Sequence, residues 1–275
     1  MSVVLITGCS SGIGRATALR LVRGGHTVYA TARRLDAIAD LAAAGCHTLA
    51  LDVTDERSMT EAVTLVEDRH GAIDVLVNNA GYGEYGAIEE ADLDRVRRQF
   101  ETNVFGLARL TQLVLPRMRA GGSGRIINVG SMGGRLVFPG GGYYHASKYA
   151  VEAISDALRF EAAPFGVQVS VIEPGLIRTG FGDTAAGTLA GSAVHAGPYA
   201  ALNRAVDESM ARGYANRTMS ATADAVAKVI EHAAVSRRPR PRYVVTPAAK
   251  LLVHARRLLG TRVWDLVLRT QFRVA

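Results

Sequence analysis

The stretch that decides the fold is residues 3–14, VVLITGCSSGIG, in which a run of aliphatic and β-branched residues leads directly into three glycines. Gly8, Gly12 and Gly14 let the backbone turn tightly, and a helix that begins there offers free N–H groups and the positive end of its dipole to a phosphate. The spacing, Gly-x-x-x-Gly-x-Gly, differs from the common dinucleotide pattern Gly-x-Gly-x-x-Gly but serves the same mechanism. A glycine-rich turn that only joins a strand to a helix is the alternative for this motif taken alone.

Apolar strands and amphipathic helices alternate along the rest of the chain. We expect strands at residues 3–7, 27–30, 48–51, 75–77, 125–129, 167–172 and 243–245, and helices at residues 12–23, 35–44, 92–119, 144–163 and 222–235, with a further helix capped by Asp55. Strands that are apolar throughout and separated by helices form a parallel sheet covered on both faces. The predicted fold is therefore one α/β domain over residues 1–275, with a doubly wound, Rossmann-type parallel sheet. Such a sheet binds its ligand beyond the carboxyl ends of its strands.

The composition is that of an ordinary globular protein. The chain has 275 residues, of which 48% are apolar and 21% are charged, so a disordered chain is excluded. No apolar run is long enough to span a membrane and the start does not resemble a signal peptide, so we expect a cytoplasmic protein. Cys9 and Cys46 form neither a metal-ligand pattern nor a disulfide framework, and no metal site is expected.

The net charge of +7 comes from the C-terminal part of the chain. Residues 237–275 contain ten Lys or Arg residues against one acid, Asp265, whereas the rest of the chain has 22 basic and 24 acidic residues. Because the body is nearly neutral and no recognition motif accompanies the basic residues, we expect no nucleic-acid partner. Arginine dominates, and lysine occurs only at Lys148, Lys228 and Lys250.

Tyr144 and Lys148 are four residues apart at the start of a predicted helix, so both side chains lie on one face. Oxidising an alcohol needs a base for the hydroxyl proton, and reducing a carbonyl needs an acid at the same place. A tyrosine can fill both roles when a nearby cation lowers its pKa from about 10. Tyr-x-x-x-Lys alone is a weak signal, because a core tyrosine beside a solvated lysine is more common. A lysine in an arginine-rich chain nevertheless indicates a specific role.

Ser131 follows the predicted strand at residues 125–129, thirteen residues before Tyr144. Its hydroxyl can hydrogen-bond a developing alkoxide and so stabilise it. The neighbouring glycines do not form the Gly-x-Ser-x-Gly elbow of a nucleophilic serine. His145 has no partnered acid in the sequence, and we expect it at the surface or at the rim of a pocket.

The chain carries these motifs in a recognisable order. After the glycine loop come Asn78-Asn79-Ala80-Gly81, then Asn103, Ser131, Tyr144-His145-Ala146-Ser147-Lys148 and finally residues 174–179, PGLIRT. Together they resemble the short-chain dehydrogenase/reductase family over about residues 3–180. The resemblance implies a catalytic tetrad of Asn103, Ser131, Tyr144 and Lys148, in which Asn103 holds a water that links Lys148 to solvent; a helix-interior asparagine without such a role is the alternative. It also implies a homodimer or homotetramer built on the long helices.

The residues that follow the second strand indicate the cofactor. NAD sites carry an acid there that accepts hydrogen bonds from the ribose 2′-OH, but no acid occurs before Asp36. Arg33 can pair with a 2′-phosphate and Ser11 can add a hydroxyl, so NADP(H) is favoured over NAD(H). The alternative is that Arg33 is only a solvated charge. With the resemblance, the predicted cofactor-binding residues are Gly8, Ser10, Ser11, Gly12, Ile13, Gly14, Arg33, Asp52, Val53, Asn79, Ala80, Gly81, Tyr144, Lys148, Pro174, Gly175, Ile177 and Thr179.

The predicted substrate walls are residues 83–86, residues 132–143 and an insertion over residues 180–220, which is rich in small residues and expected to be mobile. They supply the apolar side chains of Tyr85, Met132, Leu136, Val137, Phe138, Tyr143 and Phe181. This set favours an apolar alcohol or ketone, for example a steroid-, retinoid-, acyl- or polyketide-like compound. Packing of the same residues on the sheet is the alternative.

Residues 248–275 alternate apolar and basic positions, which indicates an amphipathic helix or two helices broken near Gly260. Such a segment can rest on an anionic membrane surface, cover the mouth of the substrate site, or pack on its own body or on a partner subunit. Packing on protein is the more frequent outcome, so membrane contact is not favoured.

We therefore expect an NADP(H)-dependent oxidoreductase that transfers a hydride between the nicotinamide and a secondary alcohol or ketone. One alternative is a non-catalytic NADP(H)-sensing regulator, and another is an epimerase or dehydratase that uses the same Tyr/Lys pair. A regulator would be expected to have lost Ser131, Tyr144 or Lys148, and all three are present.

Overall fold

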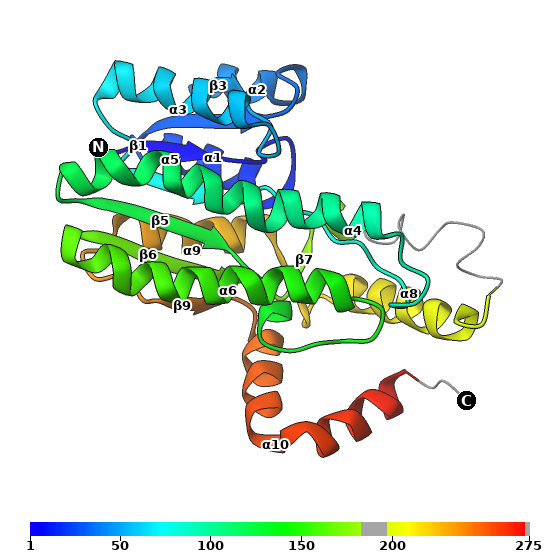
Figure 1. Ribbon diagram of the computed structural model, residues 1–275. Coiled ribbons are helices and arrows are strands. Elements are labelled where there is room, and N and C mark those ends of the chain that lie inside the picture. Colours follow the sequence, from blue (N-terminus) through cyan, green and yellow to red (C-terminus); the bar gives the residue numbers. More distant parts are fainter. Residues whose placement is uncertain (183–196, 273–275) are drawn as a thin grey trace.

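The computed structural model describes residues 1–182 and 197–272 and shows a seven-stranded parallel sheet between two layers of helices (Figure 1). The strand order is β3-β2-β1-β4-β5-β6-β9, and each neighbouring pair is parallel. The strands are β1 (Val3–Ile6), β2 (Thr27–Ala32), β3 (His47–Ala50), β4 (Val75–Asn78), β5 (Gly124–Val129), β6 (Val167–Glu173) and β9 (Arg242–Val244). The predicted doubly wound α/β fold is confirmed. The order reverses between β1 and β4, and this switch point is where such sheets bind ligands.

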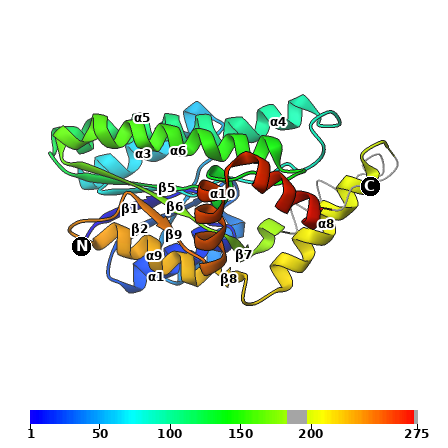
Figure 2. The ribbon, with the colours of Figure 1, turned by 90° about the horizontal axis from the view of Figure 1, so that it is seen from below.

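Helices cover both faces of the sheet, as the view from below shows (Figure 2). The helices are α1 (Gly12–Arg23), α2 (Ala39–Ala43), α3 (Glu56–His70), α4 (Leu93–Phe100), α5 (Leu107–Ala120), α6 (Gly142–Ala162), α8 (Ala200–Ala215), α9 (Ala223–Val235) and α10 (Pro247–Gln271). The core on one face contains Leu21 of α1 and Ile230 of α9. The core on the other face contains Val66 of α3, Leu110 of α5 and Leu158 of α6.

The continuous apolar run of β1 serves both of these cores. Val4 and Ile6 belong to the core under α1 and α9, whereas Leu5 belongs to the core under α3, α5 and α6. Successive side chains of a strand point to opposite faces, so a strand with helices on both sides must be apolar at every position. This is the physical reason why the unbroken run at residues 3–7 predicts a central parallel strand.

The predicted helix over residues 92–119 is interrupted in the structure. A π-helical turn, Glu101–Gly106, joins α4 to α5. A Cβ on Gly106 would lie 2.3 Å from the backbone oxygen of Val53, so the chain passes very close to the loop after β3 at this point. Apolar periodicity could not reveal the turn, because one wider turn changes the hydrogen-bond pattern but keeps the apolar face nearly continuous.

Other predicted elements agree with the structure apart from their ends. Asp55 caps α3 by accepting hydrogen bonds from the backbone N–H groups of Arg57 and Ser58, at 2.9 and 3.3 Å. The helix expected over residues 35–44 is a 3₁₀ turn, Asp36–Ile38, followed by the short α2.

The segment after β6 contains secondary structure that we did not predict. Two short strands, β7 (Leu176–Arg178) and β8 (Ser220–Thr222), pair in parallel as a second small sheet. Helix α8 lies between them in the sequence. The mobile insertion expected over residues 180–220 stays a prediction, because residues 183–196 lie outside the described part of the chain.

The basic C-terminal segment forms α10, which bends at Gly260 (φ 66°, ψ 179°), so the break predicted near this glycine is confirmed. Trp264 is only 4% exposed and packs with Leu136 and Val253. One side of the segment therefore rests on the body of the same chain. Within residues 1–182 and 197–272, no helix combines the length and apolarity needed to cross a membrane, and no cluster of three or more His, Cys, Asp or Glu residues could bind a metal ion.

Candidate active site

A cavity of about 910 Å³ opens at the carboxyl ends of the parallel strands and brings the predicted site residues together. Eighteen of the predicted residues line it: Gly8, Ser10, Ser11, Gly12, Ile13, Arg33, Asp52, Val53, Asn79, Ala80, Gly81, Ser131, Tyr144, Lys148, Pro174, Gly175, Ile177 and Thr179. Gly14 and Asn103 do not line the cavity but lie behind its wall. The motifs are far apart in the sequence and meet here because each one follows a strand of the same sheet or begins a helix at its carboxyl edge.

The glycine loop has the backbone that its sequence predicts. Gly8 and Gly12 have positive φ values of 71° and 57°, which a residue with a side chain rarely adopts. A Cβ on Gly14 would lie 2.4 Å from the Gly8 carbonyl oxygen, so Gly14 lets α1 pack directly against the loop. Ser11 caps α1 without a side-chain hydrogen bond, and the first turn carries no acid. The start of α1 therefore suits an anion.

Asn79 ties the end of β4 to this loop. Its side-chain amide donates to the carbonyl oxygens of Thr7 and Gly8, at 2.9 and 3.1 Å. In return, the Thr7 hydroxyl accepts hydrogen bonds from the backbone N–H groups of Asn79 and Ala80, at 3.0 and 2.9 Å. These contacts fix the two strands that flank the switch point, and with them the floor of the cavity.

The π-helical turn carries Asn103 behind the cavity wall, where it is almost fully buried. Its amide donates to the Tyr82 carbonyl oxygen at 2.8 Å and to the Ser147 hydroxyl at 3.0 Å, and its oxygen accepts from the Tyr82 N–H at 3.0 Å. Both amide protons are thus used by the protein. Asn103 clamps the loop after β4 onto α6, and the water that the family resemblance assigns to it stays a prediction.

Ser131, Tyr144 and Lys148 converge on the cavity from β5 and α6. Tyr144 is 7% exposed, and burial raises its pKa to about 12, although a hydrogen bond with Ser131 acts to lower it. Lys148 is 5% exposed, and its ammonium donates to the Val129 carbonyl oxygen at 2.9 Å. Burial lowers the pKa of Lys148 to about 8, against the opposing influence of Glu152.

The predicted lowering of the Tyr144 pKa by Lys148 does not occur in the protein alone. Burial disfavours the phenolate and the ammonium alike, so it raises the pKa of Tyr144 and lowers the pKa of Lys148, and the two values move apart. Tyr144 consequently keeps its proton throughout the neutral range, which suits a group that donates a proton to a carbonyl oxygen.

His145 is buried in the wall of the cavity and is not a surface residue. Its Nε2 accepts from the Phe138 N–H at 3.2 Å, and its Nδ1 lies 3.1 Å from the Gly133 carbonyl oxygen. The first contact requires an unprotonated Nε2, so Nδ1 carries the proton and donates it to Gly133. Burial lowers the pKa of His145 to about 4. The neutral imidazole therefore holds the loop between Gly133 and Phe138 in place.

The substrate side of the cavity is only partly the one expected. Tyr85, Met132, Phe138 and Phe181 line it as predicted. By contrast, Leu136 is buried against α10, Val137 is exposed, and Tyr143 lines a separate small pocket. The remaining wall comes from β7, α8, the residue before β8, and α10: Leu176, Val206, Met210, Tyr214, Met219, Leu252 and Phe272. A sequence signal for α8 did exist, because Leu202, Val206, Met210 and Tyr214 recur at helical spacing.

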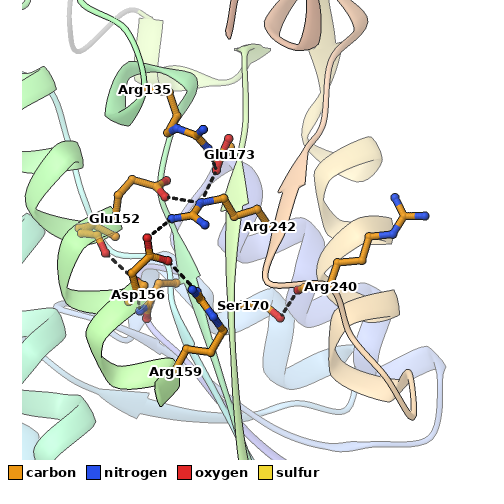
Figure 3. Close-up of polar contacts among 11 residues, drawn as sticks. Arg135, Glu152, Asp156, Arg159, Ser170, Glu173, Arg240 and Arg242 are labelled. Carbon is orange, nitrogen blue, oxygen red and sulfur yellow. Dashed lines mark hydrogen bonds and ion pairs between the residues drawn. The ribbon is translucent and has the colours of Figure 1, made fainter. Parts of the chain in front are cut away.

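A cluster of charged residues surrounds Arg242 (Figure 3), and one of them, Glu152, follows Lys148 by one turn of α6. Arg242 of β9 contacts Glu152 at 3.0 Å and Glu173 at 3.3 Å, and it also pairs with Asp156. Arg135 pairs with Glu173 at 3.1 Å. Among the described residues, Glu152 Oε1 and Glu173 Oε2 have no hydrogen-bond partner. Burial and the facing Glu173 carboxylate raise the pKa of Glu152 to about 7.

This cluster predicts a pH-dependent stability difference between the wild type and Glu152→Gln. A carboxyl group whose pKa is raised in the folded state stabilises the protein below its unfolded pKa, and this stabilisation is lost as pH rises through about 7. As pH rises from about 5 to about 8, the melting temperature of Glu152→Gln should therefore increase by several degrees relative to that of the wild type. Thermal unfolding across this range measures the difference. Glu61→Gln removes an exposed carboxylate and serves as the control. If the melting-temperature difference from the wild type were independent of pH for both variants, the prediction would be wrong.

Comparison with known proteins assigns the family. The family described as short chain dehydrogenase matches residues 2–188. The chain belongs to the short-chain dehydrogenase/reductase family. As a short-chain dehydrogenase/reductase it is an NAD(P)-dependent oxidoreductase that acts on an alcohol or ketone group.

Relatives of this short-chain dehydrogenase/reductase include two proteins named as reductases. It is 43% identical over 182 residues to 3-ketodihydrosphingosine reductase of Bacteroides thetaiotaomicron, a match that covers 66% of each chain. It is 34% identical over 276 residues to NADPH-dependent 3-dehydrocapnine reductase of Ornithobacterium rhinotracheale, covering 96% of this chain and 95% of the relative. A solved short-chain dehydrogenase from Streptomyces avermitilis is 36% identical, with a TM-score of 0.82 over 98% of this chain and 97% of that one.

Proposed function

We propose that this protein is an NADP(H)-dependent reductase of an apolar ketone, which also oxidises the corresponding secondary alcohol. The observation that carries the proposal is that Ser131, Tyr144 and Lys148 face one cavity, whose floor is the glycine loop and whose far wall is apolar. The cofactor fits this place: the start of α1 and the close approach allowed by Gly8 and Gly12 form a cradle for a pyrophosphate.

When bound, the nicotinamide cofactor supplies the hydride for reduction or accepts it for oxidation. Tyr144 is the acid that gives its proton to the carbonyl oxygen, and the base that takes it back from the alcohol. Ser131, which hydrogen-bonds Tyr144, stabilises the negative charge that develops on the same oxygen. Lys148 would hold the cofactor ribose, and its positive charge would favour the phenolate once Tyr144 has given up its proton.

The preference for NADP(H) rests on Arg33. Arg33 and Ser11 both line the cavity where β2 ends, and both are exposed. The nearest acid in the sequence, Asp36, is paired with Arg34 at 3.4 Å. A 2′-phosphate at the end of β2 would therefore meet a guanidinium group and a hydroxyl, whereas Asp36 is already engaged by Arg34.

Arg33→Asp should reverse this preference. The carboxylate would repel a 2′-phosphate and accept hydrogen bonds from a 2′-OH, so the ratio of kcat/KM for NADPH to that for NADH should fall by about 100-fold or more. Initial rates with both cofactors measure the ratio. Arg34→Asp changes the adjacent arginine in the same way and should shift the ratio far less. An unchanged ratio for Arg33→Asp would show that another residue selects the cofactor.

The substrate is proposed to be an apolar ketone because the pocket wall beyond Tyr144 consists of Met132, Phe138, Phe181 and side chains of α8 and α10. The two relatives named as reductases of 3-ketodihydrosphingosine and 3-dehydrocapnine support a ketone as the oxidised substrate. Steroid-, retinoid-, acyl- and polyketide-like ketones fit the same apolar wall.

A screen of NADPH absorbance with ketones of these classes tests the proposed function. We expect net NADPH consumption with at least one large apolar ketone, and much lower kcat/KM with a short polar ketone. Tight NADPH binding without consumption across the panel would instead indicate the sensing regulator. Conversion of a substrate without net consumption would indicate the epimerase or dehydratase.

The homodimer or homotetramer implied by the resemblance stays a proposal. Large exposed side chains on the outer side of the helical layer support it, namely Phe105 in the π-helical turn and Tyr149 and Phe160 on α6. An apolar face on paired helices is the kind of surface that copies of one chain bury against each other.

A further inference from the structure

Helix α10 stands apart from the layered body (Figure 1). It leaves the end of β9, extends away from the sheet and turns at Gly260, so that its second half runs toward α8. The view from below shows the same arm lying across the end of the domain (Figure 2). A helix in this position has one side on the protein and another side that no described part of the chain covers.

The inner side of α10 accounts for its attachment. The buried residues are Ala249 and Val253 in the first half, Trp264 in the second half, and Phe272 just after it. Phe272 also lines the substrate cavity, as does Leu252. The cavity therefore lies directly behind this helix.

The outer side is apolar as well. In the first half, Leu251 and Leu258 are 71% and 83% exposed and lie seven residues apart, on one helical face. In the second half, Val263, Leu266 and Val267 are exposed at i, i+3 and i+4, with Leu266 at 62%. Helical spacing puts these three on the side away from Trp264, Leu268 and Phe272. Six of the seventeen large apolar side chains exposed in the described chain belong to α10, so the exposure is concentrated there.

Basic residues border both apolar stripes. Lys250 and Arg257 are seven residues apart beside the stripe of the first half, and Arg262 and Arg269 repeat this spacing beside the stripe of the second half. The helix contains one acid, Asp265. None of these four bases forms an ion pair with a carboxylate of residues 1–182 or 197–272. Within the described chain, the apolar stripes are therefore exposed to solvent and the bases that border them lack a carboxylate partner.

We propose that the outer side of α10 docks on an anionic lipid bilayer surface. A bilayer interface offers an apolar layer for the two stripes and, directly above it, negative headgroups for the bordering bases. A second copy of the chain fits less well, because pairing α10 with α10 about a two-fold axis would bring like charges together. Docking would hold the helix that walls the substrate cavity at the membrane, where apolar ketones concentrate; this consequence rests on the proposed function, whereas docking itself does not.

Sedimentation of the full-length protein with vesicles tests the proposal without measuring activity. One set of vesicles is phosphatidylcholine, and the other contains about 30 mol% phosphatidylglycerol. We expect the protein to partition at least about tenfold more strongly onto the anionic vesicles, and to be released at about 0.5 M salt. The double variant Arg262→Gln/Arg269→Gln should weaken the partition coefficient by about 30-fold. Leu258→Ser/Leu266→Ser should weaken it by about tenfold or more.

Matched substitutions elsewhere serve as controls. Arg23→Gln removes an exposed arginine at the end of α1, and Val235→Ser removes an exposed apolar side chain at the end of α9. Both should bind vesicles as the wild type does. Equal partition onto neutral and anionic vesicles, or α10 variants that behave like the controls, would overturn the proposal. So would light scattering that shows a dimer which dissociates when Leu258 and Leu266 are changed, because α10 would then be an interface between copies.

Discussion

Tyr144→Phe is expected to lower kcat for ketone reduction by about a thousandfold while leaving the affinity for NADPH within a few fold of the wild type. The substitution removes only the hydroxyl that hydrogen-bonds Ser131 and gives its proton to the carbonyl oxygen. The ring keeps its packing against Tyr85 and Phe181, so the wall of the cavity is preserved. Steady-state rates and NADPH fluorescence titration measure the two quantities separately.

Tyr143→Phe is the matched control, because it makes the same chemical change one residue earlier on α6. Tyr143 lines a separate small pocket, and its variant should keep nearly the full rate. A Tyr144→Phe enzyme with a rate close to that of the wild type would show that another group transfers the proton. A loss of rate accompanied by a loss of NADPH binding would point to a collapsed site.

Lys148→Arg is expected to lower kcat/KM by about 100-fold or more, even though it keeps the positive charge. The Lys148 ammonium is enclosed: it donates to the Val129 carbonyl oxygen at 2.9 Å, and it would lie 3.5 Å from a Cβ on Gly81. A planar guanidinium is larger and would have to displace one of these neighbours. Because Lys148 is also proposed to hold the cofactor ribose, NADPH affinity should fall together with the rate, unlike in Tyr144→Phe.

Lys228→Arg provides the control for this change, since Lys228 is exposed on α9. It should leave both the rate and NADPH binding unaltered. A melting temperature for Lys148→Arg within a few degrees of the wild type establishes that the variant folds. Full activity of that folded variant would mean that charge alone matters at this position and that the choice of lysine is incidental.

Local sequence predicted the parts of the site that depend on backbone conformation. Gly8 and Gly12 adopt positive φ values, and the side chains of the apolar strand β1 pack into two cores. Both features follow from the conformation and polarity of the individual residues. The pKa of Tyr144 could not be predicted in the same way. It depends on how many apolar neighbours exclude water from the ring, and in the structure burial prevails over the nearby lysine.

Other parts of the site were missed because their signal lies in packing. His145 was expected at the surface or at the rim of a pocket; it does line the cavity, but it is buried there and its two ring nitrogens hold the loop between Gly133 and Phe138. Asn103 occupies a π-helical turn, and its amide clamps Tyr82, a contact across 21 residues that no local pattern encodes. The cluster around Arg242 joins β9 to α6 across 90 residues and is equally invisible in the sequence.

The sequence by itself determined the doubly wound sheet, the cofactor loop and the set of residues that meet at its edge, because strand periodicity and glycine geometry are local properties and parallel topology then leaves one edge for the ligand. Only the tertiary structure decided the protonation states of Tyr144 and Lys148, the apolar walls supplied by α8 and α10, and the unsatisfied outer side of α10. These depend on which surfaces become buried when distant segments pack, and burial is a property of the whole fold.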